Sequence, residues 1–103
     1  MEQLLQQFEK PITDRGEASY TVYLYGRSRP ADTWQGWLVF ERASDGKRFA
    51  TDVETTQSNA EAILYWATGL TDAYFDGALE RATRGPQRRS STRVSRRRLA
   101  GRR

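Results

Sequence analysis

The centre of the chain shows an alternation of apolar and polar residues that predicts a β-sheet. In residues 19–25 every second side chain would point to the same side of an extended backbone, the pattern of a strand with one buried face. Residues 34–43 and 47–53 are rich in aromatic and β-branched residues and predict two further strands. A loop is expected at residues 27–33, because Pro30 lacks an amide donor. The centre therefore predicts a three-stranded antiparallel meander.

The second and third predicted strands are separated by Asp45 and Gly46, a strong signal for a two-residue type I′ turn with positive φ at both positions. Such a turn pairs Phe40 with Thr51 and places apolar residues of all three strands on one face. The members of this predicted core face are Tyr20, Val22, Leu24, Leu38, Phe40, Phe49 and Val53.

Helices are predicted on both sides of the meander. Residues 2–8 carry apolar residues at helical spacing and predict a short N-terminal helix. Ser58 and Glu61 form a capping-box sequence, and a C-terminal helix follows that Gly69 can break and Thr71 can restart. The predicted fold is thus α+β: a small three-stranded antiparallel meander with both helices on one face, in the order α-β-β-β-α.

The opposite face of the predicted sheet collects the aromatic residues Tyr23, Tyr25 and Trp37. Three acids, Glu41, Asp52 and Glu54, share this face in the predicted register and would repel phosphate. Cover by a helix or the N-terminal segment is the first interpretation of the rings. A protein interface or self-association is the second, and stacking of nucleic-acid bases is the third.

The chain lacks the residue types on which most enzyme sites depend. It has no Cys and no His, which excludes disulfides, thiolate nucleophiles and imidazole ligands. Glu41, Asp52 and Glu54 could together hold Mg²⁺, but three acids on an exposed strand face are usually only solvated. We therefore expect a protein without enzymatic activity, metal or cofactor.

Charge divides the chain into two parts. The total of 17 Lys and Arg against 13 Asp and Glu is +4, but all 13 acids and only 8 bases lie in residues 1–83, giving −5. We expect residues 1–83 to form a compact acidic domain. Residues 84–103 should form a tail that is disordered unless bound, because Gly85 and Pro86 lie close to the boundary and few apolar residues follow. The tail holds nine arginines and no acid: Arg84, Arg88, Arg89, Arg93, Arg96, Arg97, Arg98, Arg102 and Arg103.

A cluster of arginines with interspersed Ser and Thr is suited to binding phosphate. The sequence predicts a non-enzymatic accessory protein whose tail binds nucleic acid, RNA in preference to DNA, while the body docks on a protein partner or assembly. The alternative is a protein-interaction or adaptor module whose tail is incidental or a localisation signal. No apolar run is long enough for a membrane span and no secretory signal begins the chain, so we expect no membrane partner and a cytoplasmic location, nuclear if the source is eukaryotic.

Overall fold

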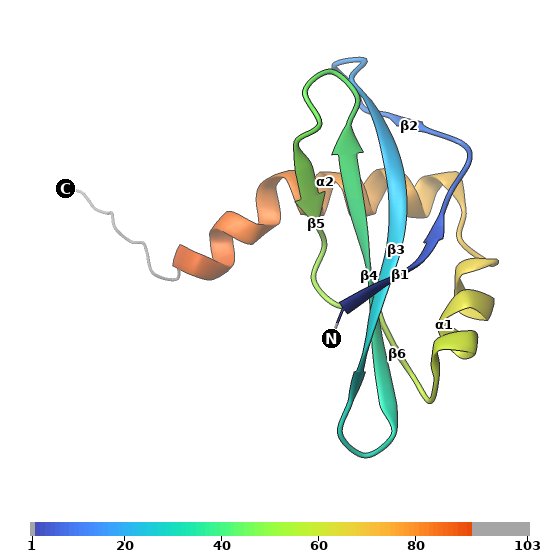
Figure 1. Cartoon of the computed structure of the whole chain (residues 1–103). Coiled ribbons are helices and arrows are strands. Elements are labelled where there is room, and N and C mark those ends of the chain that lie inside the picture. Colours follow the sequence, from blue (N-terminus) through green and yellow to red (C-terminus); the bar gives the residue numbers. More distant parts are fainter. Residues whose placement is uncertain (1, 92–103) are drawn as a thin grey trace.

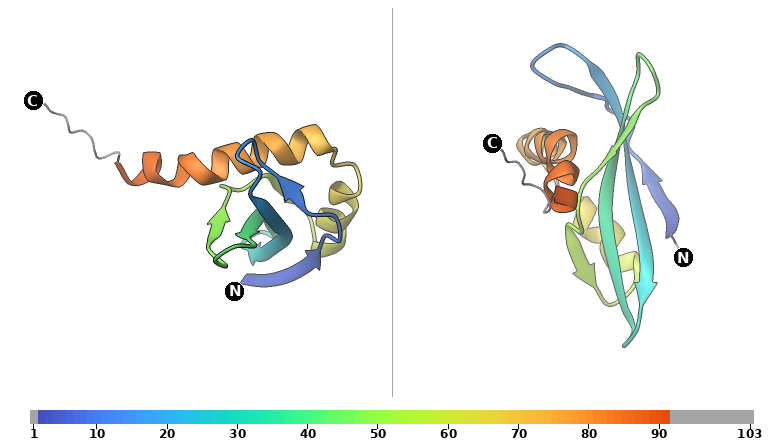
Figure 2. Two further views of the ribbon diagram at one scale, coloured as in Figure 1. Left: turned by 90° about the horizontal axis from the view of Figure 1, so that it is seen from above. Right: turned by 90° about the vertical axis from the view of Figure 1, so that its left-hand side faces the viewer.

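The computed structural model describes the backbone of residues 2–91 and the side chains up to Arg84. It contains an antiparallel sheet of six strands, with two helices on one of its faces (Figures 1 and 2). The elements are β1 (Glu2–Gln7), β2 (Ile12–Thr13), β3 (Ser19–Arg29), β4 (Thr33–Arg42), β5 (Arg48–Ala50), β6 (Thr55–Gln57), α1 (Ala60–Ala67) and α2 (Asp72–Ser91).

The sheet is organised around the long β3–β4 hairpin. The strand order is β1-β3-β4-β5, with β2 pairing with β3 and β6 with β4. The strands predicted at residues 19–25 and 34–43 are present, and the first is four residues longer because β3 continues to Arg29. The predicted fold, a three-stranded meander in the order α-β-β-β-α, is wrong, since the sheet has six strands and begins at the N-terminus.

The predicted N-terminal helix is instead strand β1, which pairs with β3. The adjacent pair Leu4 and Leu5 suggested a helix, but a register shift between Leu4 and Gln6 accommodates both residues in a strand. Leu4 lies opposite Tyr25 and is half exposed, while Leu5 packs against the core. A β-bulge allows such consecutive apolar residues in one strand, and pairing with β3 outweighs the weak helical preference of so short a segment.

The third predicted strand is divided into β5 and β6. In β5 Phe40 pairs with Phe49, two residues away from the predicted partner Thr51. The turn is longer than predicted: the amide of Gly46 donates to the carbonyl of Arg42, and Gly46 alone has positive φ, at 74°. A shift of two residues keeps the same side chains on each face, so Phe49 still lies on the core side.

After β5 the chain leaves the sheet, and β6 returns to the predicted register. Gly36 pairs with Thr55, which is the pairing that the predicted two-residue turn would give at this point. The irregular residues 51–54 therefore shift the pairing register back by two residues, which compensates for the longer turn. The amide of Leu38 donates to the Thr51 hydroxyl at 3.1 Å and the amide of Thr51 donates to the Leu38 carbonyl at 2.9 Å, which anchors this segment to β4.

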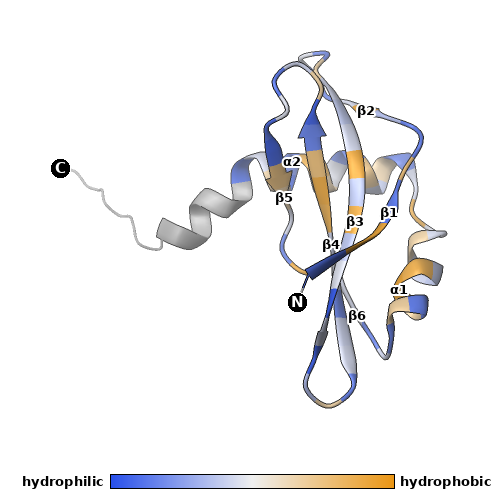
Figure 3. Ribbon diagram, in the orientation of Figure 1, coloured by the Kyte–Doolittle hydropathy of each residue, from blue (hydrophilic) through white to orange (hydrophobic). Residues whose placement is uncertain are grey.

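The core lies between one face of the sheet and the two helices. Its largest fully buried side chains are Phe40, Leu24, Leu38, Ile63 and Val22. Apolar residues fill the middle of β4 whereas the loops at the ends of the strands are hydrophilic (Figure 3). Because one face of an antiparallel sheet can remain without helices, the burial of the core face leaves the opposite face available.

The helices are capped by local hydrogen bonds. Asn59, rather than the predicted Ser58, is the N-cap of α1, and its side-chain oxygen accepts from the amide of Ala62 at 2.7 Å. The predicted break at Gly69 is confirmed because α1 and α2 are separate helices. The Thr71 hydroxyl accepts from the amide of Tyr74 at 3.2 Å, as the predicted restart requires.

Helix α2 continues through Gly85 and Pro86 to Ser91 and extends past the edge of the sheet (Figures 1 and 2). Its last residues belong to the segment that we expected to be a tail. Residues 92–103 lie outside the described residues, so the division at residue 84 stays a prediction.

The β3–β4 turn contains two residues other than glycine with positive φ, Ala31 at 65° and Asp32 at 57°. Asp tolerates this conformation, but the Cβ atom of Ala is penalised in it. We expect Ala31→Gly to raise the free energy of unfolding by about 0.5–1 kcal/mol, since relief of the steric penalty exceeds the added entropy of the unfolded glycine. Urea unfolding should show a higher midpoint for this variant. The control Ala50→Gly, in an extended strand, should show a lower midpoint, and a lower midpoint for both variants would contradict the prediction.

Candidate functional site

The three aromatic residues predicted on the outer face of the sheet lie together there. Tyr25 pairs with Trp37 across β3 and β4, and their rings stack with centroids 6.3 Å apart and an interplanar angle of 19°. Tyr23 is the next outer-face residue along β3, opposite Val39. The structure therefore brings together the residues that sequence alternation placed on one face.

Neither helix covers this outer face in the part of the chain that the structure describes. Both helices lie on the other face of the sheet (Figure 2). The buried cluster that joins them to the sheet does not include Trp37 or Val39. The expected helical cover over the rings is therefore absent, and the N-terminal segment borders them as strand β1. Trp37 is nevertheless only 9% exposed, because its neighbours within the face surround it.

Two arginines that sequence reasoning did not assign to this site lie over the rings. The guanidinium carbon of Arg27 is 5.4 Å from the centroid of Trp37, and that of Arg48 is 4.8 Å from the centroid of Tyr23. Arg48 also donates to the Tyr25 hydroxyl at 3.1 Å. These contacts are cation–π interactions. We call Tyr23, Tyr25, Arg27, Trp37 and Arg48 the outer-face cluster.

The sequence could have placed both arginines on the outer face, but only with the correct strand ends and strand pairing. Arg27 follows Tyr25 by two residues and shares its face only if the strand continues, whereas the sequence predicted a loop there. Arg48 reaches the cluster because it pairs with Glu41 in the observed register. Hydrogen bonds from Arg48, to Tyr25 first and to Glu41 second, raise the pKa of this guanidinium above its ordinary value, so it stays charged.

The three acids predicted to share the outer face do not stay together, because Glu54 leaves this face whereas Asp52 lines a cavity beside Arg27 and Trp37. Glu41 lies on it and accepts from the Nε atom of Arg48 at 2.9 Å. Glu54 lies on the helical side, where it accepts from Tyr74 and Arg81 of α2. Strand alternation fails for Glu54 because residues 51–54 are irregular. Glu41, Asp52 and Glu54 therefore cannot bind one Mg²⁺ ion together. The described residues contain no group of three or more acids placed to hold a metal.

Glu54 ties the irregular segment to α2. Its side chain is 9% exposed, and its Oε1 atom accepts from the Tyr74 hydroxyl and from Nη2 of Arg81, the latter at 2.8 Å. The Trp66 ring packs edge-on against Tyr74 at 6.0 Å. The contacts of Glu54 and Trp66 with Tyr74 together hold α1, α2 and the segment before β6 in place.

Burial, reinforced by the hydrogen bond to Glu54, raises the pKa of Tyr74 to about 12. The unfolded chain releases this proton near the ordinary pKa of about 10, so raising the pH between these values favours the unfolded state. We expect the free energy of unfolding to fall over this interval and Tyr74→Phe to remove part of the fall. Tyr20 contributes in the same direction, since burial raises its pKa too. Urea unfolding at several pH values tests this, with Tyr65→Phe as an exposed control. Equal pH slopes for wild type and Tyr74→Phe would contradict it.

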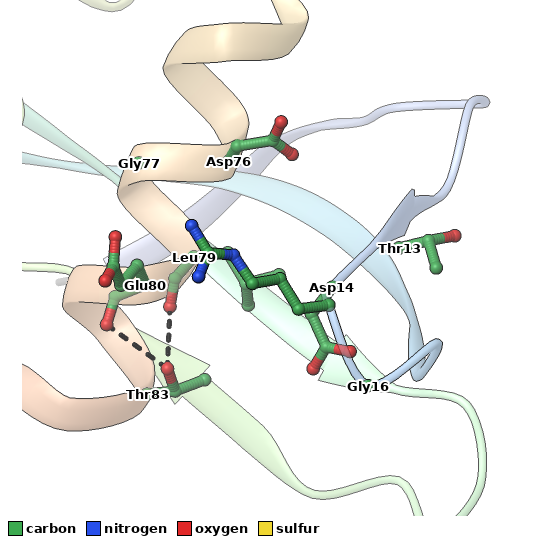
Figure 4. Close-up of a pocket in the computed structure, with 9 residues that line it drawn as sticks. Thr13, Asp14, Gly16, Asp76, Gly77, Leu79, Glu80 and Thr83 are labelled. Atoms are coloured by element: carbon green, nitrogen blue, oxygen red, sulfur yellow. Dashed lines mark hydrogen bonds between the residues drawn. The ribbon is translucent and has the colours of Figure 1, made fainter.

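A cavity of about 510 Å³ lies between the β2–β3 turn and α2 (Figure 4). Its acidic side chains are Asp14, Asp76 and Glu80. The Asp14 carboxylate accepts from the amide of Ala18 at 2.9 Å and from the Tyr20 hydroxyl at 3.0 Å; the backbone hydrogen bond is the main cause that lowers the pKa of Asp14. Asp14 therefore serves to hold the turn.

Only the first of the nine predicted nucleic-acid-binding arginines has a described side chain. Nη1 of Arg84 lies 3.8 Å from Oε2 of Glu80, one turn earlier in α2. The first arginine of the basic segment therefore lies next to an acid of the body. Arg88 and Arg89 belong to the end of α2, where only the backbone is described. The remaining predicted arginines lie outside the described residues: Arg93, Arg96, Arg97, Arg98, Arg102 and Arg103.

The chain matches no known family model, no curated protein and no solved structure. Among the described residues, none of the helices is both long enough and apolar enough to cross a membrane. The fold and site together define a small sheet protein that presents an aromatic and arginine-containing face opposite its helices.

Proposed function

We propose that the protein is a non-enzymatic accessory protein that binds nucleic acid through its arginine-rich C-terminal segment, RNA in preference to DNA. The observation that carries the proposal is the separation of charge: residues 84–103 hold nine arginines and no acid, whereas residues 1–83 carry −5. Arginine binds phosphate with two parallel hydrogen bonds and stacks on bases. Short arginine-rich segments commonly fold on structured RNA.

The course of α2 supports this function. The helix packs on the sheet through Phe75, Ala78, Leu79 and Ala82 and then continues past the edge of the sheet (Figure 1). The basic segment therefore begins at a distance from most of the acidic body. The negative charge of residues 1–83 repels phosphates. A nucleic acid meets less of this repulsion when the arginine-rich segment begins beyond the edge of the sheet.

Salt dependence tests the proposal. If six to nine arginines contact phosphates, the logarithm of the association constant should fall with the logarithm of salt concentration at a slope of about −5 to −8 for a duplex. Replacement of the nine arginines by glutamine should lower affinity by at least about 100-fold near 100 mM salt and flatten the slope. Replacement of the same arginines by lysine is the matched control and should retain the slope on duplex DNA.

Fluorescence anisotropy with an RNA hairpin and a DNA duplex of equal length measures both affinities and the preference for RNA. Equal binding by the glutamine variant and the wild type would overturn the proposal. Equal affinities for the two probes would remove only the preference.

A protein-interaction module is the second candidate, because Tyr, Trp and Arg are the residue types enriched at the energetic centres of protein interfaces. The outer-face cluster contains only these types. Self-association would appear in sedimentation as twice the monomer mass.

A further inference from the structure

The outer face of the sheet carries flat side chains stacked on one another. Tyr25 and Trp37 are stacked, Arg27 covers Trp37, and Arg48 covers Tyr23. We propose that this outer-face cluster is a second nucleic-acid contact, which stacks the unpaired bases of a single strand. The inference rests on the nucleic-acid binding proposed above and adds the class of ligand: strands with unpaired bases.

Space for a base exists beside the stacked rings. A cavity of about 280 Å³ is lined by Arg27, Trp37, Thr51 and Val53 together with the acids Glu2 and Asp52. Val53 was predicted on the core face, but the irregular residues 51–54 leave it 41% exposed. Leu4, across from Tyr25, is 50% exposed. A base that stacks beside Trp37 can cover these exposed apolar side chains, and the burial of their surface favours stacking.

The two arginines are held to different degrees, which suggests different roles. Arg48 is fixed by hydrogen bonds of 2.9 Å to Glu41 and 3.1 Å to Tyr25, so its guanidinium plane is a rigid stacking surface. Arg27 donates two long hydrogen bonds, both 3.4 Å, to Gln35. A base can therefore displace Arg27 from Trp37, and the released guanidinium can then bind the phosphate of the same nucleotide.

The charges on this face do not favour phosphate, because the acids Glu2, Glu41 and Asp52 outnumber Arg27 and Arg48. Arg27 lies opposite Glu2, and Arg48 lies opposite Glu41, while Glu54 is on the helical side. Binding at this face must therefore depend on stacking more than on charge. Stacking changes little with salt, whereas phosphate binding by the arginine-rich segment falls steeply, so the two contributions can be separated by measurement.

The test uses the full chain and three labelled probes of 20 units: oligo-dT, an abasic strand with the same backbone, and a DNA duplex. Tyr25→Leu and Arg27→Gln should each weaken oligo-dT binding on the order of tenfold, the loss of one stacked base, and should leave the abasic and duplex affinities unchanged. Tyr65→Leu removes an 80% exposed aromatic ring from α1, outside the outer-face cluster, and should bind oligo-dT as the wild type does. Arg15→Gln, in the β2–β3 turn, is the control for loss of one positive charge.

The outcomes distinguish this inference from the proposed function. Equal affinity of the wild type for oligo-dT and the abasic strand, or unchanged oligo-dT binding by Tyr25→Leu with a native unfolding midpoint, would overturn the inference and leave the binding by the C-terminal segment intact. If the glutamine variant of the nine arginines still binds the duplex like the wild type, the proposed function fails instead. A dimer in sedimentation that Arg27→Gln dissociates, with oligo-dT binding unchanged, would assign the face to a protein interface and also overturn the inference.

Discussion

Replacement of Ile63 by alanine is expected to lower the free energy of unfolding by about 2–5 kcal/mol. Ile63 of α1 is fully buried, and its side chain reaches the sheet. It packs where Gly26 and Gly36 lie opposite each other on β3 and β4. The absence of two side chains at this pair lets the helix approach the sheet closely, so removal of the isoleucine leaves a cavity that its neighbours cannot readily fill.

The same geometry makes the effect of Gly36→Ala depend on Ile63. A Cβ atom at Gly36 would lie 2.9 Å from Cγ2 of Ile63 and 3.2 Å from Cγ2 of Thr55, which is overpacking that costs about 1–3 kcal/mol. In the Ile63→Ala background the added methyl group occupies the vacated space, so Gly36→Ala should cost much less there. A double-mutant cycle measures this coupling.

Urea unfolding of the four proteins in the cycle, followed by circular dichroism, provides the measurement. Tyr65→Ala is the control in the same helix, since Tyr65 is 80% exposed and its loss should change stability by about 0.5 kcal/mol or less. Additive effects of Gly36→Ala and Ile63→Ala would contradict the packing described here.

Replacement of Glu54 by glutamine is the second large effect and should lower the free energy of unfolding by about 1.5–3 kcal/mol. The Glu54 carboxylate is nearly buried and accepts from both Tyr74 and Arg81. Glutamine keeps the shape but loses the charge that faces the Arg81 guanidinium, which is then left without its ionic partner.

The contact between Lys10 and Asp72 provides the control. These side chains are 3.1 Å apart, compared with 2.8 Å for Arg81 and Glu54, but they are 74% and 71% exposed, so solvent weakens their attraction. Asp72→Asn should therefore shift the unfolding midpoint far less than Glu54→Gln. Equal shifts for the two variants would show that Glu54 is not a structural tie.

Local patterns were sufficient for the central hairpin and for its two faces. Strict alternation places Trp34 against the core and Trp37 on the outer face, as the period of two requires. The β3–β4 register is continuous through Gly36, so the alternation holds along the whole strand. The break between the helices also followed from short-range signals at Gly69 and Thr71.

The N-terminal segment and the third strand could not be predicted, because each depends on distant partners. Leu4 and Leu5 fit a helix and a bulged strand equally well, and only pairing with β3 decides between them. The turn after β4 is lengthened by side-chain contacts: Asp45 accepts from the amide of Lys47 and from the guanidinium of Arg42. The Asp-Gly pattern that predicts a two-residue turn carries no information about these side-chain contacts.

The sequence by itself determined which side chains alternate across β3 and β4, where the helices break, and that the arginines concentrate after residue 83, because these properties depend on neighbours within a few positions. Only the tertiary structure decided that the N-terminal segment is a strand, that Arg27 and Arg48 cover the rings of Trp37 and Tyr23, and that Glu54 turns toward α2. Those features depend on strand lengths and on an irregular segment, whose conformation is set by the packing of the whole sheet.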